Sequence, residues 1–426
     1  MATAAAAAAA RPAMVSLPRL LSTCADAARR GCLVIRAVQA GREGGRNGEG
    51  GSSSLGVRYK VGGDPRSALT EADGAAQRVV LACLRGRWGD GLAIVGEEDE
   101  DEDEGGGEGD GSGDPFAAYA VPAPAAFPLR EDLAHPPGGA GGWEVPLSSV
   151  CVYVDPMDGT REFVEGRLGN VQCLVGIAVG GRAVGGAAGL PFPGGRTNGG
   201  EDVAEAEAEG EGGGEGPVQV VYGLAPGGGG GAVLGRVAVE EDAGEGGDVG
   251  SGGIFVPLPF FPSSPVPSPP LDAGPPRLTV LTGDSRRPEK DLALSVLRDL
   301  CGEDGVAMDV RTAGGSGNKM HRVALAAGAG AGDGADVIAV APRGTCSWDT
   351  AAPTGVLLAA LAAGRGRPGL VSDLAARDLR YDWGGGDVTN GAGVLASCGD
   401  RAERYHRELC RRLLKRGIEE MIDKPR

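Results

Sequence analysis

Histidine, aromatic residues and long apolar runs are all scarce in this chain. Its 426 residues include 3 histidines, and aromatic side chains make up 4%. The histidines lie far apart, at His135, His321 and His406, so no histidine-based zinc site is predicted and each is expected in the core or on the surface. No apolar run approaches the roughly 20 residues that a membrane-spanning helix needs, which argues against a membrane protein.

Basic residues are also in short supply. The chain has 41 Lys and Arg against 58 Asp and Glu, which gives a net charge of −17. Nucleic-acid binding needs clustered basic residues, so no nucleic-acid partner is expected. The acidic excess lies mainly in Glu97–Asp110 and Glu201–Glu215, which we interpret as solvated inserts.

Closely paired cysteines are missing as well. Nine cysteines stand singly, without a CxxC pair, which indicates free buried thiols in a reducing compartment. The Ala-rich segment Met1–Pro12 has two interpretations, the start of an organelle transit peptide or a low-complexity extension. A cytoplasmic monomer is predicted, with an organelle as the alternative location.

Glycine, by contrast, is abundant, with 79 residues. Much of it lies in runs that cannot pack, so long disordered insertions are predicted at about 100–145 and 194–275. The remaining residues suffice for one sizeable enzyme core. The expected parts are an extension over 1–13, an N-terminal α+β subdomain over 14–275 and a C-terminal α/β subdomain over 276–426.

Apolar spacing and turn residues predict alternating helices and strands. Helices are expected at Ser16–Val38, Thr70–Trp88, Arg161–Glu165, Lys290–Cys301, Met320–Ala327, Asp349–Ala363 and Arg401–Ile422. Strands are expected at Leu92–Val95, Val150–Val154, Val171–Val179, Ala183–Ala188, Arg277–Thr282, Val306–Arg311 and Ala335–Ala341, with a weak pair at Val218–Tyr222 and Ile254–Leu258. Gly391–Cys398 is a further apolar segment. This alternation is typical of a layered α/β fold.

The segment Asp155–Thr160, with the sequence DPMDGT, follows a predicted strand. Pro156 restricts the backbone, so a turn is expected that points Asp155 and Asp158 the same way and exposes the Met157 carbonyl. Two carboxylates and a carbonyl suit Mg²⁺, and the helix that begins at Gly159 and Thr160 suits a phosphate. The alternative is a surface turn with an Asp helix cap.

Two further carboxylates are expected at the same place. Glu97 ends the Leu92–Val95 strand, and Asp349 follows the Ala335–Ala341 strand and opens a helix. In the alternative interpretation, Glu97 only opens an acidic run and Asp349 only caps a helix. All four acids together would hold two or three metal ions, which activate a water without a covalent nucleophile.

A glycine-rich loop, Gly314–Lys319, lies between a strand and a helix. Its glycines would let a flat ring approach the backbone, and Lys319 would pair with a second anionic group of a ligand. In a chain this rich in glycine, an ordinary loop is the alternative. The sequence therefore favours a phosphorylated small molecule with a ring as the ligand.

In chain order, the segments Gly96–Asp99, Asp155–Thr160 and Trp348-Asp349 resemble the lithium-sensitive, magnesium-dependent inositol monophosphatase superfamily. The likeness extends from about Ser16 to Arg411, apart from the inserts, and is strongest to the bisphosphate nucleotidases of that superfamily. The likeness also rests on the segments Val152–Gly166, Asn170–Ala178, Gly314–Lys319, Ser347–Thr350 and Asn390–Ala396.

The resemblance implies a fold, a substrate class and a set of site residues. The fold would be an αβαβα sandwich of the inositol monophosphatase/fructose-1,6-bisphosphatase type. The reaction would convert adenosine 3′(2′),5′-bisphosphate to AMP and phosphate. The implied metal ligands are Glu97, Asp155, Asp158, Asp349 and the Met157 carbonyl; Thr160 would orient the attacking water; the substrate would contact Gly159, Thr160, Ser285, Arg286, Gly315, Lys319 and Asp349.

Two departures from the superfamily pattern stand out. The activating carboxylate is assigned to Asp64, which lies further upstream of the stretch Thr70–Asp73 than the pattern predicts. Arg286 stands where histidine is expected. An inositol phosphate phosphatase and a non-catalytic phosphometabolite-binding protein are therefore kept as alternative functions.

Overall fold

The structure is a computed structural model. It describes residues 13–46, 58–59, 68–98, 116, 143–195, 216–225, 227, 232–241, 253–258, 275–328, 336–363, 367–385 and 388–422. Asp64, His135 and most of the first predicted insertion lie outside the described residues.

Seven strands form the larger sheet, in the order β11-β10-β9-β8-β7-β6-β4. Their bounds are Ala93–Gly96 (β4), Val150–Asp158 (β6), Gln172–Val179 (β7), Arg182–Leu190 (β8), Val218–Leu224 (β9), Val233–Glu241 (β10) and Gly253–Leu258 (β11). β4 and β6 are parallel, and the other neighbours are antiparallel. A two-glycine hairpin turn joins β7 to β8, with φ of 56° at Gly180 and 74° at Gly181.

Five strands form the smaller sheet, in the order β13-β12-β14-β16-β15. Their bounds are Arg277–Thr282 (β12), Ala307–Thr312 (β13), Asp336–Ala341 (β14), Gly369–Ser372 (β15) and Val394–Cys398 (β16). β12 is parallel to β13 and β14, so these three strands end at one edge of the sheet. Ligands of α/β folds bind at such edges.

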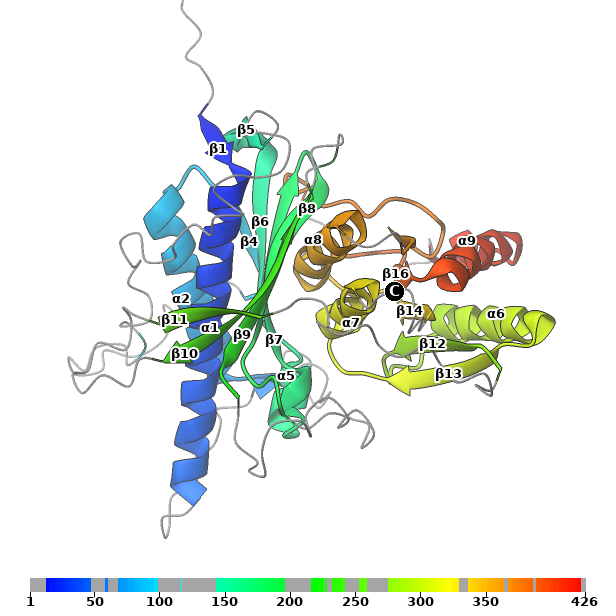
Figure 1. Ribbon diagram of the computed structural model, residues 1–426, viewed down its shortest axis with the longest axis horizontal. Helices are drawn as coiled ribbons and strands as arrows, with labels where there is room; N and C mark the ends of the chain where they lie inside the picture. Colours follow the sequence, from blue (N-terminus) through cyan, green and yellow to red (C-terminus); the bar gives the residue numbers. More distant parts are fainter. Residues whose placement is uncertain are drawn as a thin grey trace, which may run out of the picture.

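Helices lie outside and between the two sheets (Figure 1). α1 (Leu17–Arg46) and α2 (Glu71–Trp88) cover the larger sheet, and α6 (Pro288–Asp304) and α9 (Asp400–Lys415) cover the smaller one. α7 (Ser316–Gly328) and α8 (Ser347–Ala363) form the middle layer. The predicted αβαβα sandwich is therefore confirmed.

Short elements complete the chain. They are β1 (Met14–Ser16), β2 (Arg58–Tyr59), β3 (Ala68–Leu69), β5 (Glu144–Pro146), α5 (Thr160–Val164), α10 (Ile418–Ile422) and two 3₁₀ turns at Leu147–Ser149 and Leu168–Asn170. β1 pairs with β5, and β2 pairs with β3. Strands of two or three residues are too short for alternation to reveal, and none of these four was predicted.

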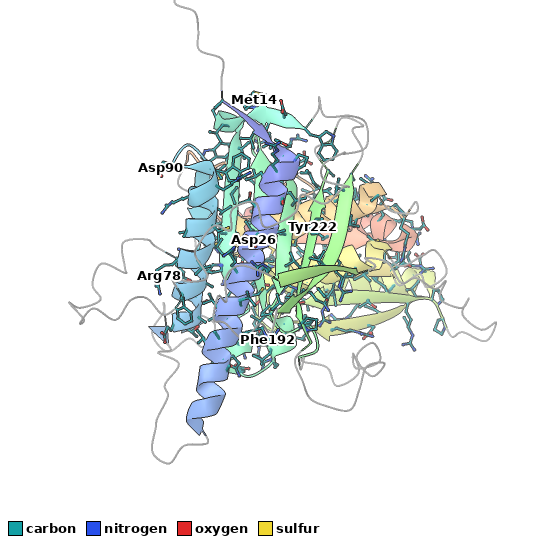
Figure 2. All side chains as sticks on the ribbon, turned by 60° about the vertical axis from the view of Figure 1, so that its left-hand side comes forward. Met14, Asp26, Arg78, Asp90, Phe192 and Tyr222 are labelled. Carbon is teal, nitrogen blue, oxygen red and sulfur yellow. The ribbon has the colours of Figure 1, made fainter. Side chains whose placement is uncertain are left out.

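The α1–α2 layer contains a charged group in an otherwise apolar interface. Asp26, midway along α1 in Figure 2, accepts hydrogen bonds from Arg29 Nη2 at 2.8 Å and Arg30 Nε at 2.9 Å. All three side chains are buried. Because they are three and four residues apart on one helix, the ion pairing is local, and the Cys83 thiol of α2 adds a contact of 3.9 Å to Asp26 Oδ2.

α8 lies very close to the larger sheet because glycines face each other across the contact. A Cβ atom on Gly176 of β7 would lie 2.5 Å from the Ala352 nitrogen, and one on Gly355 of α8 would lie 2.3 Å from the Gly185 carbonyl carbon. Both distances are below the 3.0 Å that real Cβ atoms respect. This close crossing brings the first turn of α8 to the end of β6.

The interpretation of residues 194–275 as mostly insertion is wrong for β10, whereas β9 and β11 confirm the strands expected at Val218–Tyr222 and Ile254–Leu258. β9, β10 and β11 form one edge of the larger sheet, and Val220, Tyr222 and Val237 are buried in its core. The predicted pair β9 and β11 do not contact each other, because β10, which was not predicted, lies between them. Glycine-rich runs on both sides of β10 hide its apolar pattern.

Several boundaries also differ from the predictions. β6 continues through Asp158 instead of turning at Pro156, and α1 extends to Arg46. α7 begins at Ser316, so Lys319 lies in the helix and not in the preceding loop. The predicted closing helix divides into α9 and α10, separated by Gly417 with a φ of 75°.

The cysteine and histidine predictions are confirmed where the structure describes them. All nine cysteines are free thiols, and eight of them are buried. His321 and His406 are buried in the core. Within the described part of the chain, the helices are too short or too polar to cross a bilayer.

Candidate metal and substrate site

Three aspartates converge where the middle layer meets the larger sheet. Asp155 and Asp158 lie at the end of β6, and Asp349 lies in the first turn of α8. One carboxylate oxygen from each residue lies within 4.8 Å of the other two. The structure thus brings together three of the four carboxylates that the sequence placed at one site.

A β-bulge aligns Asp155 with Asp158. Along β7 their partners are Leu174 and Gln172, so three steps along β6 match two steps along β7. In a regular strand, residues three apart point to opposite faces, and the extra residue of the bulge returns both aspartates to one face. Pro156 suits this position because it has no N–H to donate to a ladder. The expected common direction is correct, but the bulge produces it, not a turn.

Asp158 is held by the N-terminus of α7. Its two carboxylate oxygens accept the backbone N–H groups of Ser316 at 2.9 Å and Asn318 at 3.0 Å. Gly315 has a φ of 72°, and a Cβ there would lie 2.4 Å from Asp158 Oδ2. The glycines of the loop therefore leave room for the carboxylate of Asp158. The sequence did not predict this packing role.

Lys319 is anchored by the same loop. Its ammonium donates to the carbonyl oxygens of Ala313 at 3.3 Å and Gly315 at 2.5 Å, and the side chain is buried. Burial lowers its pKa, whereas the nearby Asp158 and Asp349 raise it. Lys319 thus lines the pocket as a cation that already has internal partners.

Asp349 both caps α8 and faces the cluster. Its carboxylate accepts the backbone N–H of Cys346, so the capping role considered as an alternative is present. Asn390 supports this turn by donating to the Cys346 carbonyl at 2.9 Å and lying 3.1 Å from Thr350 Oγ1. Capping fixes the carboxylate in place and leaves its other oxygen available.

Glu97 lies on the wall of the same pocket, at the end of β4. Gln77 of α2 fixes the segment just after β4, because its side-chain oxygen accepts the backbone N–H of Glu98 at 3.0 Å. Burial raises the pKa values of Asp155 and Asp349, and the charge of Glu97 adds to both shifts. Glu97 is therefore the fourth acid of the site, although it lies outside the trio.

The sequence did not predict the contact between the Asp73 carboxylate and Thr160. Asp73 of α2 lies 2.9 Å from the Thr160 hydroxyl through Oδ1, while its Oδ2 accepts the N–H and the hydroxyl of Thr70, both at 2.7 Å. Asp73 is 1% exposed, and burial raises its pKa to about 7. The sequence signal for this contact was an acidic residue at the third position of α2. The same signal equally indicates a capping box, in which the acid only stabilises the start of the helix.

The role of Asp64 as the activating carboxylate stays a prediction. Asp64 lies outside the described residues. Among the described acids, Asp73 is the one that contacts Thr160. The Thr160 hydroxyl also lies 3.2 Å from the Met157 carbonyl, so it is fixed between the bulge and α2.

A pocket of about 450 Å³ between the two sheets is lined by the three aspartates, Glu97, Thr160 and Lys319. Its walls include Gly159, Ser285 and Gly315 from the predicted substrate contacts. Arg286 is exposed and does not line it, whereas the adjacent Arg287 does. The pocket wall therefore contains Arg287, whereas the resemblance had implied that Arg286 contacts the substrate.

The cluster has the electrostatics of a cation site. Burial raises the pKa of Asp155 well above its usual range, and Glu97 and Asp158 add to the shift. Burial and the charge of Asp158 raise the pKa of Asp349 to about 8. Burial also raises the pKa of Asp158, to about 6, against the lowering effect of Lys319 and the α7 N–H groups. Close, buried oxygen donors of like charge are a donor set that fits Mg²⁺.

Comparison with known proteins gives the site a family context. Residues 33–212 match the Inositol monophosphatase family, and this span includes Glu97 and the DPMDGT segment. The match covers less than half of the chain. The matched span contains β4, β6, β7 and β8, whereas Asp349 lies beyond it.

Two curated relatives that are similar to this chain carry the same name. The 3′(2′),5′-bisphosphate nucleotidase 1 of Dictyostelium discoideum is 30% identical over 141 residues, which are 33% of this chain and 40% of the relative. The human protein of that name is 26% identical over 176 residues, 41% of this chain and 48% of the relative. The chain thus matches less than half the length of these relatives.

Solved structures similar to the chain include two bacterial proteins. CysQ from Bacteroides thetaiotaomicron is 18% identical, with a TM-score of 0.45 over 89% of this chain and 97% of that structure. The suhB protein from Bartonella henselae is 15% identical, with a TM-score of 0.47 over 92% of this chain and 98% of that structure.

Proposed function

We propose that this protein is a magnesium-dependent phosphatase that hydrolyses the 3′(2′)-phosphate of adenosine 3′(2′),5′-bisphosphate. One observation carries the proposal: Asp155, Asp158 and Asp349 converge on one side of a pocket whose wall also presents the Thr160 hydroxyl. The names of the curated relatives support the nucleotide as the substrate.

The chain's own oxygen atoms would hold the metal. The ligands would be the three aspartates, Glu97 and the Met157 carbonyl. Bound Mg²⁺ supplies positive charge that stabilises the phosphoryl oxygens and lowers the pKa of water. No side chain needs to form a covalent intermediate, because two aspartates three residues apart differ from the i, i+2 pair of aspartyl-phosphate enzymes.

Thr160 and Asp73 would orient and deprotonate the attacking water. When the Thr160 hydroxyl donates to Asp73, its lone pairs remain to accept a hydrogen bond from a water in the pocket. The water's proton can then pass to the hydroxyl oxygen as the hydroxyl proton passes to Asp73. The new bond joins the water oxygen to phosphorus, the ester P–O bond breaks, and the leaving oxygen takes a proton from solvent. Such proton transfer contributes roughly 10²–10⁴-fold.

The decisive measurement is phosphate release by the full chain from adenosine 3′,5′-bisphosphate and from inositol 1-phosphate. Each substrate is tested with and without Mg²⁺ and Li⁺. We expect Mg²⁺-dependent, Li⁺-inhibited turnover of the nucleotide. Turnover of inositol 1-phosphate alone would establish the inositol phosphatase instead, and tight nucleotide binding without turnover would establish a binding protein.

The role of Asp73 has its own test. Asp73→Asn keeps the size of the side chain and removes the proton acceptor. We expect kcat to fall about 10²-fold or more with little change in Mg²⁺ affinity. A kcat within a few-fold of the wild-type value would remove Asp73 from the mechanism.

A further inference from the structure

Four cationic side chains line the pocket, and three of them already have partners in the protein. Lys319 donates to the Ala313 and Gly315 carbonyls. Arg161 donates to Glu165 at 2.8 Å and also to Asp284. Arg343 donates to the carbonyl oxygens of Gly391 at 3.0 Å and Met421 at 2.9 Å. Each of these three cations would have to give up or share an existing contact to bind a ligand.

Arg287 differs from the other three. It lines the pocket, yet among the described residues its side chain forms no hydrogen bond or ion pair. It stands immediately before α6, with extended backbone at a φ of −138°, and its side chain does not cap the helix. The side chain is exposed, so its guanidinium is available to a ligand in the pocket.

The pocket offers more room and more charge than one phosphoryl group uses. A volume of about 450 Å³ lies in the range of pockets that bury a whole small molecule. The metal-binding acids come from β6 and α8, whereas Arg287 comes from the segment after β12 in the other sheet. A guanidinium matches the oxygens of a phosphate in two parallel hydrogen bonds.

We propose that Arg287 binds a second anionic group of the substrate and thereby selects bisphosphorylated over monophosphorylated molecules. This inference rests on the proposed function, because it assumes that the phosphate to be cleaved lies at the aspartate cluster. Arg287 is a specificity-determining residue, and it takes no part in proton transfer or in cleavage.

The test compares Arg287→Gln with Arg286→Gln, its neighbour outside the pocket. Both changes remove one exposed positive charge from the same segment, so long-range electrostatics are matched. Substrates are adenosine 3′,5′-bisphosphate and adenosine 3′-monophosphate, which differ in the second phosphate. For Arg287→Gln we expect KM for the bisphosphate to rise about tenfold with kcat retained, and less than about twofold change for the monophosphate. Arg286→Gln should leave both substrates unchanged, and Arg287→Lys should recover part of the loss.

Three results would overturn the proposal. They are an unchanged KM in Arg287→Gln, equal losses on both substrates, and an equal loss in Arg286→Gln. If the wild-type protein hydrolyses neither nucleotide, the proposed function fails, and calorimetric binding of adenosine 3′,5′-bisphosphate then tests Arg287 by itself. Weaker binding by Arg287→Gln alone would still support it, and absent or unchanged binding would reject it.

Discussion

Two groups of buried carboxylates in this protein are treated in opposite ways. Asp26, in the α1–α2 layer, is paired with Arg29 and Arg30 of its own helix. The trio of Asp155, Asp158 and Asp349 has carboxylate oxygens within 4.8 Å of one another, and the buried ammonium of Lys319 opposes the pKa rise that burial causes in Asp158 and Asp349. The first group is neutralised internally, and the second is not.

The difference indicates which group serves structure and which serves function. Burying a charge is costly unless a partner or hydrogen bonds compensate for it. Asp26 meets that requirement from within the chain. The trio meets it only in part, through the backbone N–H group of Met157 and those at the α7 and α8 N-termini. Carboxylates left in this condition are common at functional sites.

The largest expected effect separates the two groups by activity. Asp155→Asn removes one ligand charge, so phosphate release should fall on the order of 10³-fold, a loss of about 4 kcal/mol in transition-state stabilisation. The metal-free variant should unfold at the same temperature as the wild type or higher, because one repelling buried charge is gone. Retained activity at saturating Mg²⁺ would show that Asp155 is not a ligand.

For Asp26→Asn we expect a loss of stability without a loss of activity. Arg29 and Arg30 lose their shared counter-charge inside the helix layer, so the free energy of unfolding should drop by about 3 kcal/mol. Activity per folded molecule should not change, since Asp26 lies outside the pocket. Urea unfolding monitored by circular dichroism gives the first quantity, and active-site titration gives the second. A loss of kcat without a loss of stability would contradict the structural role of Asp26.

Metal binding offers a third comparison. If the trio awaits a cation, Mg²⁺ at about 100 times its dissociation constant should stabilise the wild type by about 2.7 kcal/mol. Mg²⁺ should raise the free energy of unfolding of Asp26→Asn by the same amount, although this variant is less stable to begin with. It should raise that of Asp155→Asn much less. Thermal unfolding with and without Mg²⁺ measures all three. Equal stabilisation of Asp155→Asn would place the cation elsewhere.

The smallest expected effect concerns a buried base, His406. The Ser372 hydroxyl donates to the Asp373 carbonyl, so it accepts from His406 Nε2–H at 2.8 Å, and Nδ1 accepts from Ser397 at 2.9 Å. Burial and the charge of Arg407 lower its pKa to about 3. Because the folded state excludes a proton that the unfolded state binds below about pH 6.5, stability is retained above that pH and lost as pH falls.

The expected slope from this group is about 1.4 kcal/mol for each pH unit below the unfolded pKa. His406→Gln should reduce the pH dependence of unfolding by that amount between about pH 6.5 and about pH 5. His321→Gln is the matched variant, because burial lowers the pKa of His321 to about 4. An unchanged slope in both variants would mean that other groups control acid unfolding.

Much of the fold was predictable because its signals are local. The periodic apolar residues of α2 and the helix-capping residue type at Thr70 predict its start within one residue, and β12 has the bounds expected of it. β10 was missed because glycine-rich neighbours hide a strand whose partners come from other parts of the chain. The inserts could be located by composition, but composition does not show which parts of them pair with a sheet.

The sequence alone determined the chemistry that is available: carboxylates at strand and helix ends, a DPMDGT segment suited to a metal and a phosphate, and apolar periods typical of a layered α/β fold. Tertiary structure alone decided which residues meet. It paired Thr160 with Asp73 across 87 positions, brought Asp155 and Asp158 to one face through a bulge, and placed Arg287 instead of Arg286 in the pocket wall. The reason is physical, since periodicity and capping act within a few residues, whereas contacts between elements depend on how the layers pack.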